Sequence, residues 1–301
     1  MTGECFNLSE KAEVKKQKCV SMKYELYSGA GNDFVMIDNI TEGIPFEKQS
    51  ELTIKLCADN FPQIDGVIFA DKPLSENAAV RMNYYNRDGS FGAMCGNGAR
   101  CIAMFAYKNG ITGKRKFTLE AVDDTYTAEI LDDESVRIGF PEPKEIKTEV
   151  RISDEAGKPL NVSYTNVGSD HILVFIDEDI NKLFLNCSDM DKLDVDSIGR
   201  MLRFHKDFTP RGGNVNFAQV LSDGSIRLRT YERGVERETL ACGTGIISTG
   251  IIAMMNKGFS SPVKIKVQSG EVLLVNGRLD NGKILDLCLT GSARKIGEGS
   301  L

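Results

Sequence analysis

Short runs of alternating apolar and polar residues follow one another along this 301-residue chain. In the first half they read, in chain order, KYELYS, FVMIDN, GVIFAD, AAVRMNYY, KFTLEA, YTAEIL and SVRIGF. They are rich in β-branched and aromatic residues, and Gly, Asn and Asp separate them, which favours short β-strands. Three similar runs, VKIKVQ, EVLLV and ILDLCL, lie near the other end. The pattern therefore predicts many strands and few helices.

The two clearest helical patterns follow the tetrapeptides CGNG, at Cys95, and CGTG, at Cys242. Apolar residues recur there at roughly helical spacing, namely Ile102, Phe105 and Ala106 in one segment and Ile247, Ile251 and Met254 in the other. Each segment runs into a glycine, Gly110 or Gly258, a residue type that readily adopts the left-handed conformation found just past helix ends. We predict one helix after each cysteine.

The two Cys-Gly-X-Gly motifs lie inside longer segments that resemble each other. Residues 80–87, VRMNYYNR, match residues 226–233, IRLRTYER, in apolar alternation and in their polar ends. Three strand-like runs follow each helix, and the two cysteines are 242 − 95 = 147 positions apart. A looser echo joins GNDF at Gly31 to GNVNF at Gly213. We interpret the pattern as the duplication of a whole α/β domain, which would place two cysteines across one cleft.

Charge and apolar content exclude several classes of protein. Lys plus Arg total 37 against 43 Asp plus Glu, so the chain lacks the basic excess that binding to a phosphate backbone needs, and we expect no nucleic-acid partner. No apolar run reaches the length of a membrane span, and the first twenty residues contain no apolar signal core. We therefore expect a cytoplasmic protein without a membrane partner, and we interpret residues 1–21 as a disordered extension.

The start of a helix is a natural site for an anion, because its first N–H groups lack partners and the positive end of the helix dipole lies behind them. Two such ends could hold one carboxylate, and the same field would lower the pKa of a cysteine thiol below its free value of about 8.5. The carbon next to that carboxylate would lie between two sulfurs. One sulfur could remove a proton while the other delivers one to the opposite face. The result is inversion of a stereocentre, which requires no cofactor.

Simpler interpretations apply to the other cysteines and to metal. A lone cysteine is most often core filler, and we assign that role to four of them, Cys57, Cys101, Cys187 and Cys288. The C-x5-C spacing of Cys95 and Cys101 is not that of a zinc pair, and the only two histidines, His171 and His205, lie in no ligand pattern. We expect no metal. GAGNDF, GNGARC and GTGIIS each lack the third glycine of a dinucleotide-binding loop.

Three motifs together, GAGNDFVMIDN, MCGNGARC and YERGVERETLACGTG, resemble the diaminopimelate epimerase family from about Met22 onward. The resemblance implies an α/β (α+β) fold of two pseudo-symmetric domains, each a curved mixed or antiparallel sheet around a central helix, with the active site in the cleft between them. The implied boundaries are residues 22–140 with 289–301 for the first domain and residues 141–288 for the second.

The resemblance also implies the chemistry. Cys95 and Cys242 would be the acid and the base of a pyridoxal-independent epimerisation of LL- to meso-diaminopimelate, on the route to lysine and peptidoglycan. The backbone at Gly96, Asn97, Gly243 and Thr244 would hold the reacting carboxylate, and the substrate would be oriented by Asn32, Asn86, Asn214, Glu232 and Arg233. Glu232 beside Arg233 offers an acceptor for a distal ammonium and a fork for a distal carboxylate.

His171 and two departures from the family pattern leave alternatives open. The resemblance places His171 near the thiols, where it, like Glu232, could tune their pKa, although a lone buried histidine is often only structural. The chain reads Ser169-Asp170-His171 where the family has Asn-Pro-His, and FPQIDG at residues 61–66 where the family has Gly-Ile-Gly-Ala-Asp-Gly. Both could alter the substrate, so an epimerase or racemase of another amino acid, such as histidine or a lanthionine-like diamino acid, stays open.

Two hypotheses of a different class also remain. A thiol–disulfide protein could bridge Cys95 and Cys242 across the cleft, and an amino-acid binding module would keep its affinity for ligand without either thiol. The partner expected on every enzymatic interpretation is a small-molecule amino acid. Whether the chain forms a homodimer is left open.

Overall fold

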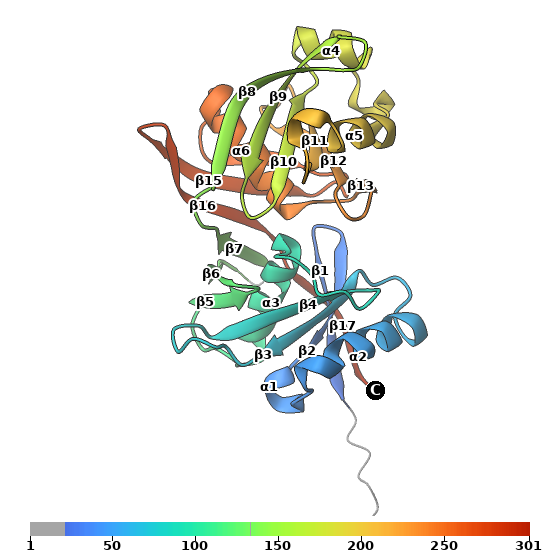
Figure 1. The fold of residues 1–301 in the computed structure, drawn as a ribbon. Helices are drawn as coiled ribbons and strands as arrows, with labels where there is room; N and C mark the ends of the chain where they lie inside the picture. The colour runs from blue at the N-terminus through green and yellow to red at the C-terminus, as the bar shows by residue number, and fades with distance from the viewer. Residues whose placement is uncertain (1–21, 133) are drawn as a thin grey trace, which may run out of the picture.

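The computed structural model describes residues 22–132 and 134–301, so the predicted extension over residues 1–21 lies outside the described residues. Two lobes, each built on strands, lie one above the other, and a long strand near the C-terminus runs from one into the other (Figure 1). The mixed α+β class expected from the sequence is confirmed.

The first lobe is built from the N-terminal part of the chain. Its elements are β1 (Lys23–Gly29), β2 (Asn32–Ile37), α1 (Asn39–Glu42), α2 (Phe46–Asp59), β3 (Gly66–Asp71), β4 (Val80–Asn86), α3 (Gly96–Lys108), β5 (Lys116–Ala121), β6 (Asp124–Ile130) and β7 (Ser135–Gly139). Each strand-like run of the first half falls on one of these strands. Gly110, with φ +72°, follows the end of α3 as predicted.

The second lobe follows the same plan with more helix on its outer face. Its elements are β8 (Glu145–Ser153), β9 (Pro159–Asn166), β10 (Asp170–Phe175), α4 (Asp179–Leu185), η1 (Met190–Lys192), α5 (Val195–Arg203), η2 (Lys206–Phe208), β11 (Asn214–Val220), β12 (Ile226–Glu232), β13 (Arg237–Thr239), α6 (Gly243–Asn256), β14 (Val263–Lys266), β15 (Val272–Asp280), β16 (Lys283–Ser292) and β17 (Arg294–Ser300). Gly258, with φ +70°, lies just beyond α6.

Strand pairing confirms the duplication. In the first lobe β2 pairs parallel with β3, β3 antiparallel with β4, and β4 parallel with β5. In the second lobe β10, β11, β12 and β14 repeat this order and these directions. GNDF and GNVNF are not equivalent positions of the duplication. GNDF leads into β2 and GNVNF leads into β11, whereas the strand that corresponds to β2 in the second lobe is β10.

The lobes are joined by strands as well as by packing. β16 pairs on one side with β15 and on the other with β7, and β17 then pairs with β1 of the first lobe. Hydrogen bonding is thereby continuous through all seventeen strands of the described residues. The predicted boundary at residues 288/289 falls inside β16, which belongs to both sheets, and the domain limits stay a prediction.

Each lobe encloses one apolar helix. Residues 96–106 of α3 are all buried, in a core that the strands of the first lobe surround. In α6, residues 245–254 are buried in the equivalent core of the second lobe. A helix that is apolar on nearly all sides is stable only when it is surrounded in this way. The central helix predicted for each sheet is confirmed.

Further helices cover the outer faces, where the sequence pattern contained little signal. α2 packs on the first sheet through Leu56 and Cys57, and α5 packs on the second through Val195 and Leu202. These helices have polar outer faces, so their apolar positions are few and easily read as part of a loop. They leave both N-termini of the central helices free to face the junction between the lobes.

Candidate active site

Both cysteines of the duplicated motif occupy the same position, directly before the first turn of a central helix. Cys95 precedes α3 with φ −104° and ψ 111°, and Cys242 precedes α6 with φ −118° and ψ 111°. The Cys95 Sγ accepts a hydrogen bond from the backbone N–H of Gly98 at 3.4 Å. Both thiols therefore lie at the positive end of a buried helix, and in Cys95 a bond from the first turn also fixes the sulfur.

The two helices meet end to end at their first glycines. A Cβ atom added to Gly243 would lie 3.1 Å from the Gly96 Cα and 3.2 Å from the Gly96 nitrogen, and one added to Gly96 would lie 3.4 Å from the Gly243 Cα. Only residues without side chains allow backbones to approach so closely. The geometry thus brings both predicted thiols, and both predicted carboxylate-binding turns, to one place between the lobes.

Burial controls the ionisation of the thiols. Loss of solvent raises the pKa of Cys95 despite the hydrogen bond from Gly98, and it raises the pKa of Cys242 to about 12. The negative charge of Glu232 raises the pKa of both thiols further. The expectation that the helix ends lower these pKa values is wrong, because the desolvation of a thiolate here outweighs the stabilisation that the helix ends provide.

Glu232 ends β12 and lies close enough to both thiols to act on them electrostatically. Burial raises its own pKa, and the hydrogen bond that its Oε2 accepts from Thr239 at 2.9 Å opposes this. This position agrees with the predicted role of Glu232 in tuning the thiol pKa values, which stays a prediction. As a carboxylate, Glu232 raises these pKa values and so favours the neutral thiols.

His171 is fully buried and its hydrogen bonds assign one tautomer. The Asn216 amide donates to the backbone oxygen of Ile172 at 3.3 Å and to the His171 Nδ1 at 3.0 Å. Because Nδ1 accepts, the ring proton is on Nε2. Burial lowers the pKa of His171 to about 3, with the charge of Arg233 acting in the same direction, so the imidazole is neutral.

A chain of hydroxyl groups connects this imidazole to one thiol. The His171 Nε2 lies 2.9 Å from the Ser169 Oγ, and Ser169 lies 3.1 Å from the Thr244 Oγ1. Thr244 in turn lies 3.6 Å from the Cys242 Sγ. Ser169, one of the departures from the family pattern, therefore connects His171 with Cys242. In the sequence, Ser169 was marked only by standing where the family has Asn.

On the α3 side, the predicted residues Asn32 and Asn97 contact each other. The Asn97 amide donates to the Asn32 Oδ1 at 2.6 Å, and its own oxygen accepts from Arg100 at 2.9 Å. The guanidinium of Arg100 is fully buried and also donates to the backbone oxygens of Gly96 and Ser292. Arg100 was missed by the sequence analysis, although a charged residue inside an apolar helix is itself a signal.

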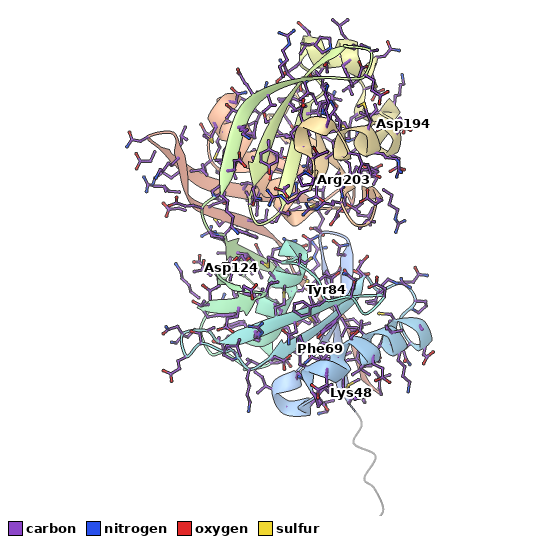
Figure 2. The ribbon with its side chains drawn as sticks, viewed as in Figure 1. Lys48, Phe69, Tyr84, Asp124, Asp194 and Arg203 are labelled. Carbon is purple, nitrogen blue, oxygen red and sulfur yellow. The ribbon has the colours of Figure 1, made fainter. Side chains whose placement is uncertain are left out.

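Asn86 ends β4, as Glu232 ends β12, and a tyrosine fixes its amide. The Tyr84 hydroxyl donates to the Asn86 Oδ1 at 2.9 Å, and the Asn86 nitrogen donates to the Ser90 Oγ at 2.9 Å. Figure 2 shows Tyr84 on the side of the first lobe that faces the second. Burial raises the pKa of Tyr84, and electrostatic interactions with Cys95 and Glu232 raise this pKa further.

Asn214 and Arg233 form a second group with Asp170. The Asn214 amide donates to the backbone oxygen of Asp170 at 3.1 Å and accepts from the backbone N–H of Arg233 at 2.9 Å. The guanidinium of Arg233 pairs with the Asp170 carboxylate at 3.0 Å. Asn214 thus holds the starts of β10 and β11 to the end of β12, and its role toward a substrate stays a prediction.

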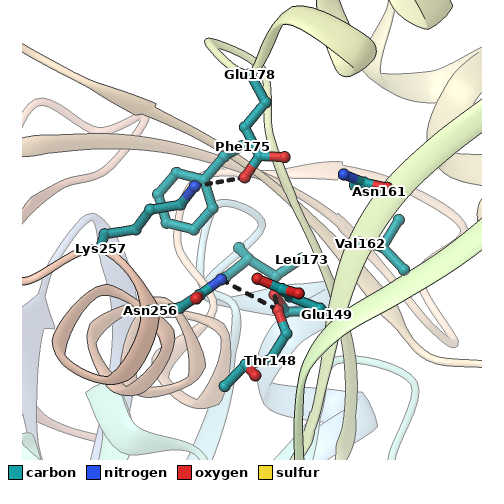
Figure 3. A pocket seen from close by; sticks show the side chains of 10 residues that line it. Thr148, Glu149, Asn161, Val162, Leu173, Phe175, Glu178, Asn256 and Lys257 are labelled. Atoms are coloured by element: carbon teal, nitrogen blue, oxygen red, sulfur yellow. Dashed lines mark hydrogen bonds and ion pairs between the residues drawn. The ribbon is translucent and has the colours of Figure 1, made fainter.

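A pocket of about 270 Å³ lies elsewhere, between the C-terminal end of α6 and the strands β8, β9 and β10 (Figure 3). Its lining includes an ion pair between Glu178 and Lys257 and none of the predicted site residues. Among the residues described, no group of three or more His, Cys, Asp or Glu side chains could hold a metal ion. In the same part of the chain, no helix is both long and apolar enough to cross a bilayer.

A sequence model of the family "Diaminopimelate epimerase" matches residues 24–143 and 163–296. A diaminopimelate epimerase from Hydrogenobaculum sp. is 36% identical over 283 residues, which cover 91% of this chain and 96% of that relative. One from Chlorobaculum tepidum is 37% identical over 278 residues, which cover 91% and 99%.

A solved structure shares the fold at much lower identity. A Bacillus anthracis phenazine biosynthesis protein of the PhzF family aligns with a TM-score of 0.67 at 14% identity, over 93% of this chain and 99% of the other. That likeness shows the architecture of two equivalent lobes and nothing finer. The sequence matches span both lobes and both thiol motifs, and the chain therefore belongs to the diaminopimelate epimerase family.

Proposed function

We propose that this chain epimerises LL-2,6-diaminopimelate to meso-diaminopimelate with a pair of cysteines and without a cofactor. The observation that carries the proposal is the meeting of two helix N-termini at Gly96 and Gly243, each preceded by a thiol. Unpaired N–H groups from both helices would hold the carboxylate next to the reacting carbon. The enzyme would then be an isomerase that acts in the biosynthesis of lysine and of peptidoglycan precursors.

In the proposed reaction one thiolate removes the α-proton while the other cysteine, still a thiol, delivers a proton from the opposite face. The two cysteines exchange roles in the reverse direction. Both thiols have a raised pKa. The ammonium of a bound amino acid would bring a positive charge close to them, and an opposite charge favours the thiolate. Substrate binding itself would then prepare the base.

The far end of the substrate carries a second ammonium and a second carboxylate. We propose that Glu232 and Asn86 accept from the ammonium and that Arg233 donates to the carboxylate. The relatives with 36–37% identity support diaminopimelate over histidine or a lanthionine-like amino acid. They also favour an epimerase over a redox protein or a binding module, and both cysteines are free thiols.

We propose the cytoplasm as the location, because the mechanism requires reduced cysteines and reducing compartments maintain them. The partner is the small-molecule substrate.

The decisive test is deuterium incorporation at the α-carbon in heavy water under reducing conditions, with LL-diaminopimelate and histidine as parallel substrates. We expect exchange and epimerisation of diaminopimelate and no exchange on histidine. Cys95→Ser and Cys242→Ser should each reduce epimerisation by about a thousandfold or more, since each removes one proton carrier. Cys187→Ser is the control, because its sulfur only donates to the Asp189 backbone and a hydroxyl can replace it.

Turnover of diaminopimelate by both serine variants at the wild-type rate would exclude the two-thiol mechanism. Exchange on histidine alone would retain the mechanism and reject the substrate. Loss of activity in Cys187→Ser as well would point to general damage to the fold.

A further inference from the structure

Asp170, the first residue of β10, lies at the centre of a buried polar cluster beside the proposed distal site. Its side chain is only 5% exposed. One oxygen, Oδ1, accepts from the Tyr164 hydroxyl at 2.5 Å and from the Asn166 amide at 2.9 Å, and Arg211 lies 3.6 Å away. The other oxygen, Oδ2, accepts from Arg233 at 3.0 Å. Three donors and one further positive charge therefore converge on one carboxyl group.

Only a carboxylate can satisfy this arrangement, because it accepts through both oxygens and donates through neither. An asparagine at position 170 would turn an NH₂ group toward a donor whichever way its amide pointed. Burial opposes ionisation of Asp170, but hydrogen bonds from Tyr164 and Arg233 and the charge of Arg211 outweigh it, so the pKa of Asp170 is lowered. The group is thus built to stay ionised.

The cluster holds one side of the Arg233 guanidinium and leaves the other free. In the described part of the chain, Asp170 is the only side chain that pairs with Arg233, and the contact uses Nη1 alone. The arginine side chain is 31% exposed, and its Nε and Nη2 groups make no hydrogen bond within the described residues. Its neighbour along the chain is Glu232, which acts electrostatically on both thiols. Arg233 pairs with Asp170, and the residue before Asp170, Ser169, contacts Thr244 at the start of α6, so Arg233 lies close to the half of the site that carries Cys242.

We propose that Asp170 is a specificity-determining residue that positions Arg233 for the second carboxylate of the substrate. Asp170 does not itself contact the substrate in this proposal. It fixes the direction of the guanidinium, so that a substrate carboxylate meets a preorganised donor pair instead of a mobile side chain. The inference rests on the proposed function and adds the residue that sets recognition at the distal end.

The test compares two substrates in the full-length chain. Diaminopimelate has the distal carboxylate, and lysine is the same molecule without it. For Asp170→Asn we expect KM for diaminopimelate to rise about tenfold, the size of one lost charge-assisted contact, with kcat within about twofold of wild type. Slow α-deuterium exchange on lysine should be unchanged. Glu178→Gln is the matched control, since it breaks a carboxylate–lysine pair in the pocket of Figure 3.

A second variant covers the case in which Asp170→Asn does not fold. Tyr164→Phe removes one donor to Asp170 and leaves its pair with Arg233, so KM for diaminopimelate should rise about twofold to threefold and exchange on lysine should not change. Equal losses on both substrates, or a lower KM for diaminopimelate, would overturn the positioning role. A wild-type protein without diaminopimelate activity would overturn the proposed function too, whereas wild-type activity with unaffected variants would overturn only this inference.

Discussion

His171 shows how much a single buried residue gains from its neighbours. By sequence it was either a tuner of thiol pKa or a structural residue. The structure gives it a neutral ring, with a proton on Nε2, connected through Ser169 and Thr244 to Cys242. A neutral imidazole adds no charge near the thiol. Any effect of His171 on Cys242 must therefore act through hydrogen bonds, and the tuning role stays a prediction.

The same residue predicts a dependence of stability on pH. The pKa of His171 is lowered from 6.5 to about 3 on folding. The stabilisation from its neutral ring is therefore complete above pH 6.5 and is lost as the pH falls toward 3, because the unfolded chain then binds a proton that the folded chain rejects. Urea unfolding between pH 3.5 and 7 should show a shallower decrease for His171→Gln than for wild type.

Carboxylates also titrate between pH 3.5 and 7 and change the stability of both proteins. The contribution of His171 is therefore measured by the difference in unfolding free energy between wild type and His171→Gln at each pH. The variant should be less stable than wild type at pH 7, since a glutamine cannot match both ring contacts. If the plots of unfolding free energy against pH were parallel for wild type and His171→Gln, His171 would bind its proton in the folded protein as readily as in the unfolded chain, and the prediction would be wrong.

Arg100 and Tyr84 are the site residues that the sequence analysis missed. Arg100 carried a signal, a charge within the apolar run GNGARCIAMFA, but its three acceptors come from its own first turn and from Ser292 at the end of β16. Tyr84 carried none, because alternation along a strand does not tell which tyrosine hydroxyl faces the cleft. Neighbouring strands decide that direction.

At the level of elements, the starts and ends of both central helices were predicted correctly from Cys-Gly-X-Gly and from Gly110 and Gly258. The contact between the two starts could not be predicted. It depends on glycines in two segments whose backbones touch only after both lobes form. Spacing along the chain carries no information about that distance.

The close contact predicts a steric effect of one methyl group. In Gly243→Ala the new Cβ would lie 3.1 Å from the Gly96 backbone, which cannot move aside as a flexible side chain would. The two helix ends should separate by a few tenths of an ångström, and we expect kcat to fall about tenfold to a hundredfold, as small misplacements of reacting groups do. Steady-state kinetics with diaminopimelate would measure the change.

Gly113→Ala is the matched control, because a Cβ there meets no atom within 4 Å. Its activity should equal that of wild type. Full activity in Gly243→Ala would mean that the tight approach of the helices is not needed for the reaction.

At the level of the whole molecule, the lobes share strands. β16 pairs with both β15 and β7, and β17 closes the sheet beside β1. Loss of one lobe would leave the shared strand with unpaired backbone groups along one edge. The two lobes are therefore expected to unfold together, although each has its own apolar core.

Thiol labelling tests this coupling. Cys101 is fully buried in the first lobe, and Cys242 is 7% exposed in the second. In a urea series, pulse labelling followed by mass spectrometry should show both cysteines becoming reactive at the same midpoint, which should coincide with the loss of circular dichroism. Separate midpoints for the two residues would show that the lobes unfold independently.

Local patterns in the chain were enough to predict the strands of the first lobe, three strands near the C-terminus, the two central helices and the duplication, and to select two thiols as candidates, because alternation, glycine stops and repeated motifs are local properties. Only the tertiary structure decided the contact between Gly96 and Gly243, the raised thiol pKa values and the pairing of Asp170 with Arg233. Those features depend on burial and on distances between segments far apart in sequence. Desolvation, which reversed the expected shift of the thiols, arises only when the lobes close around them.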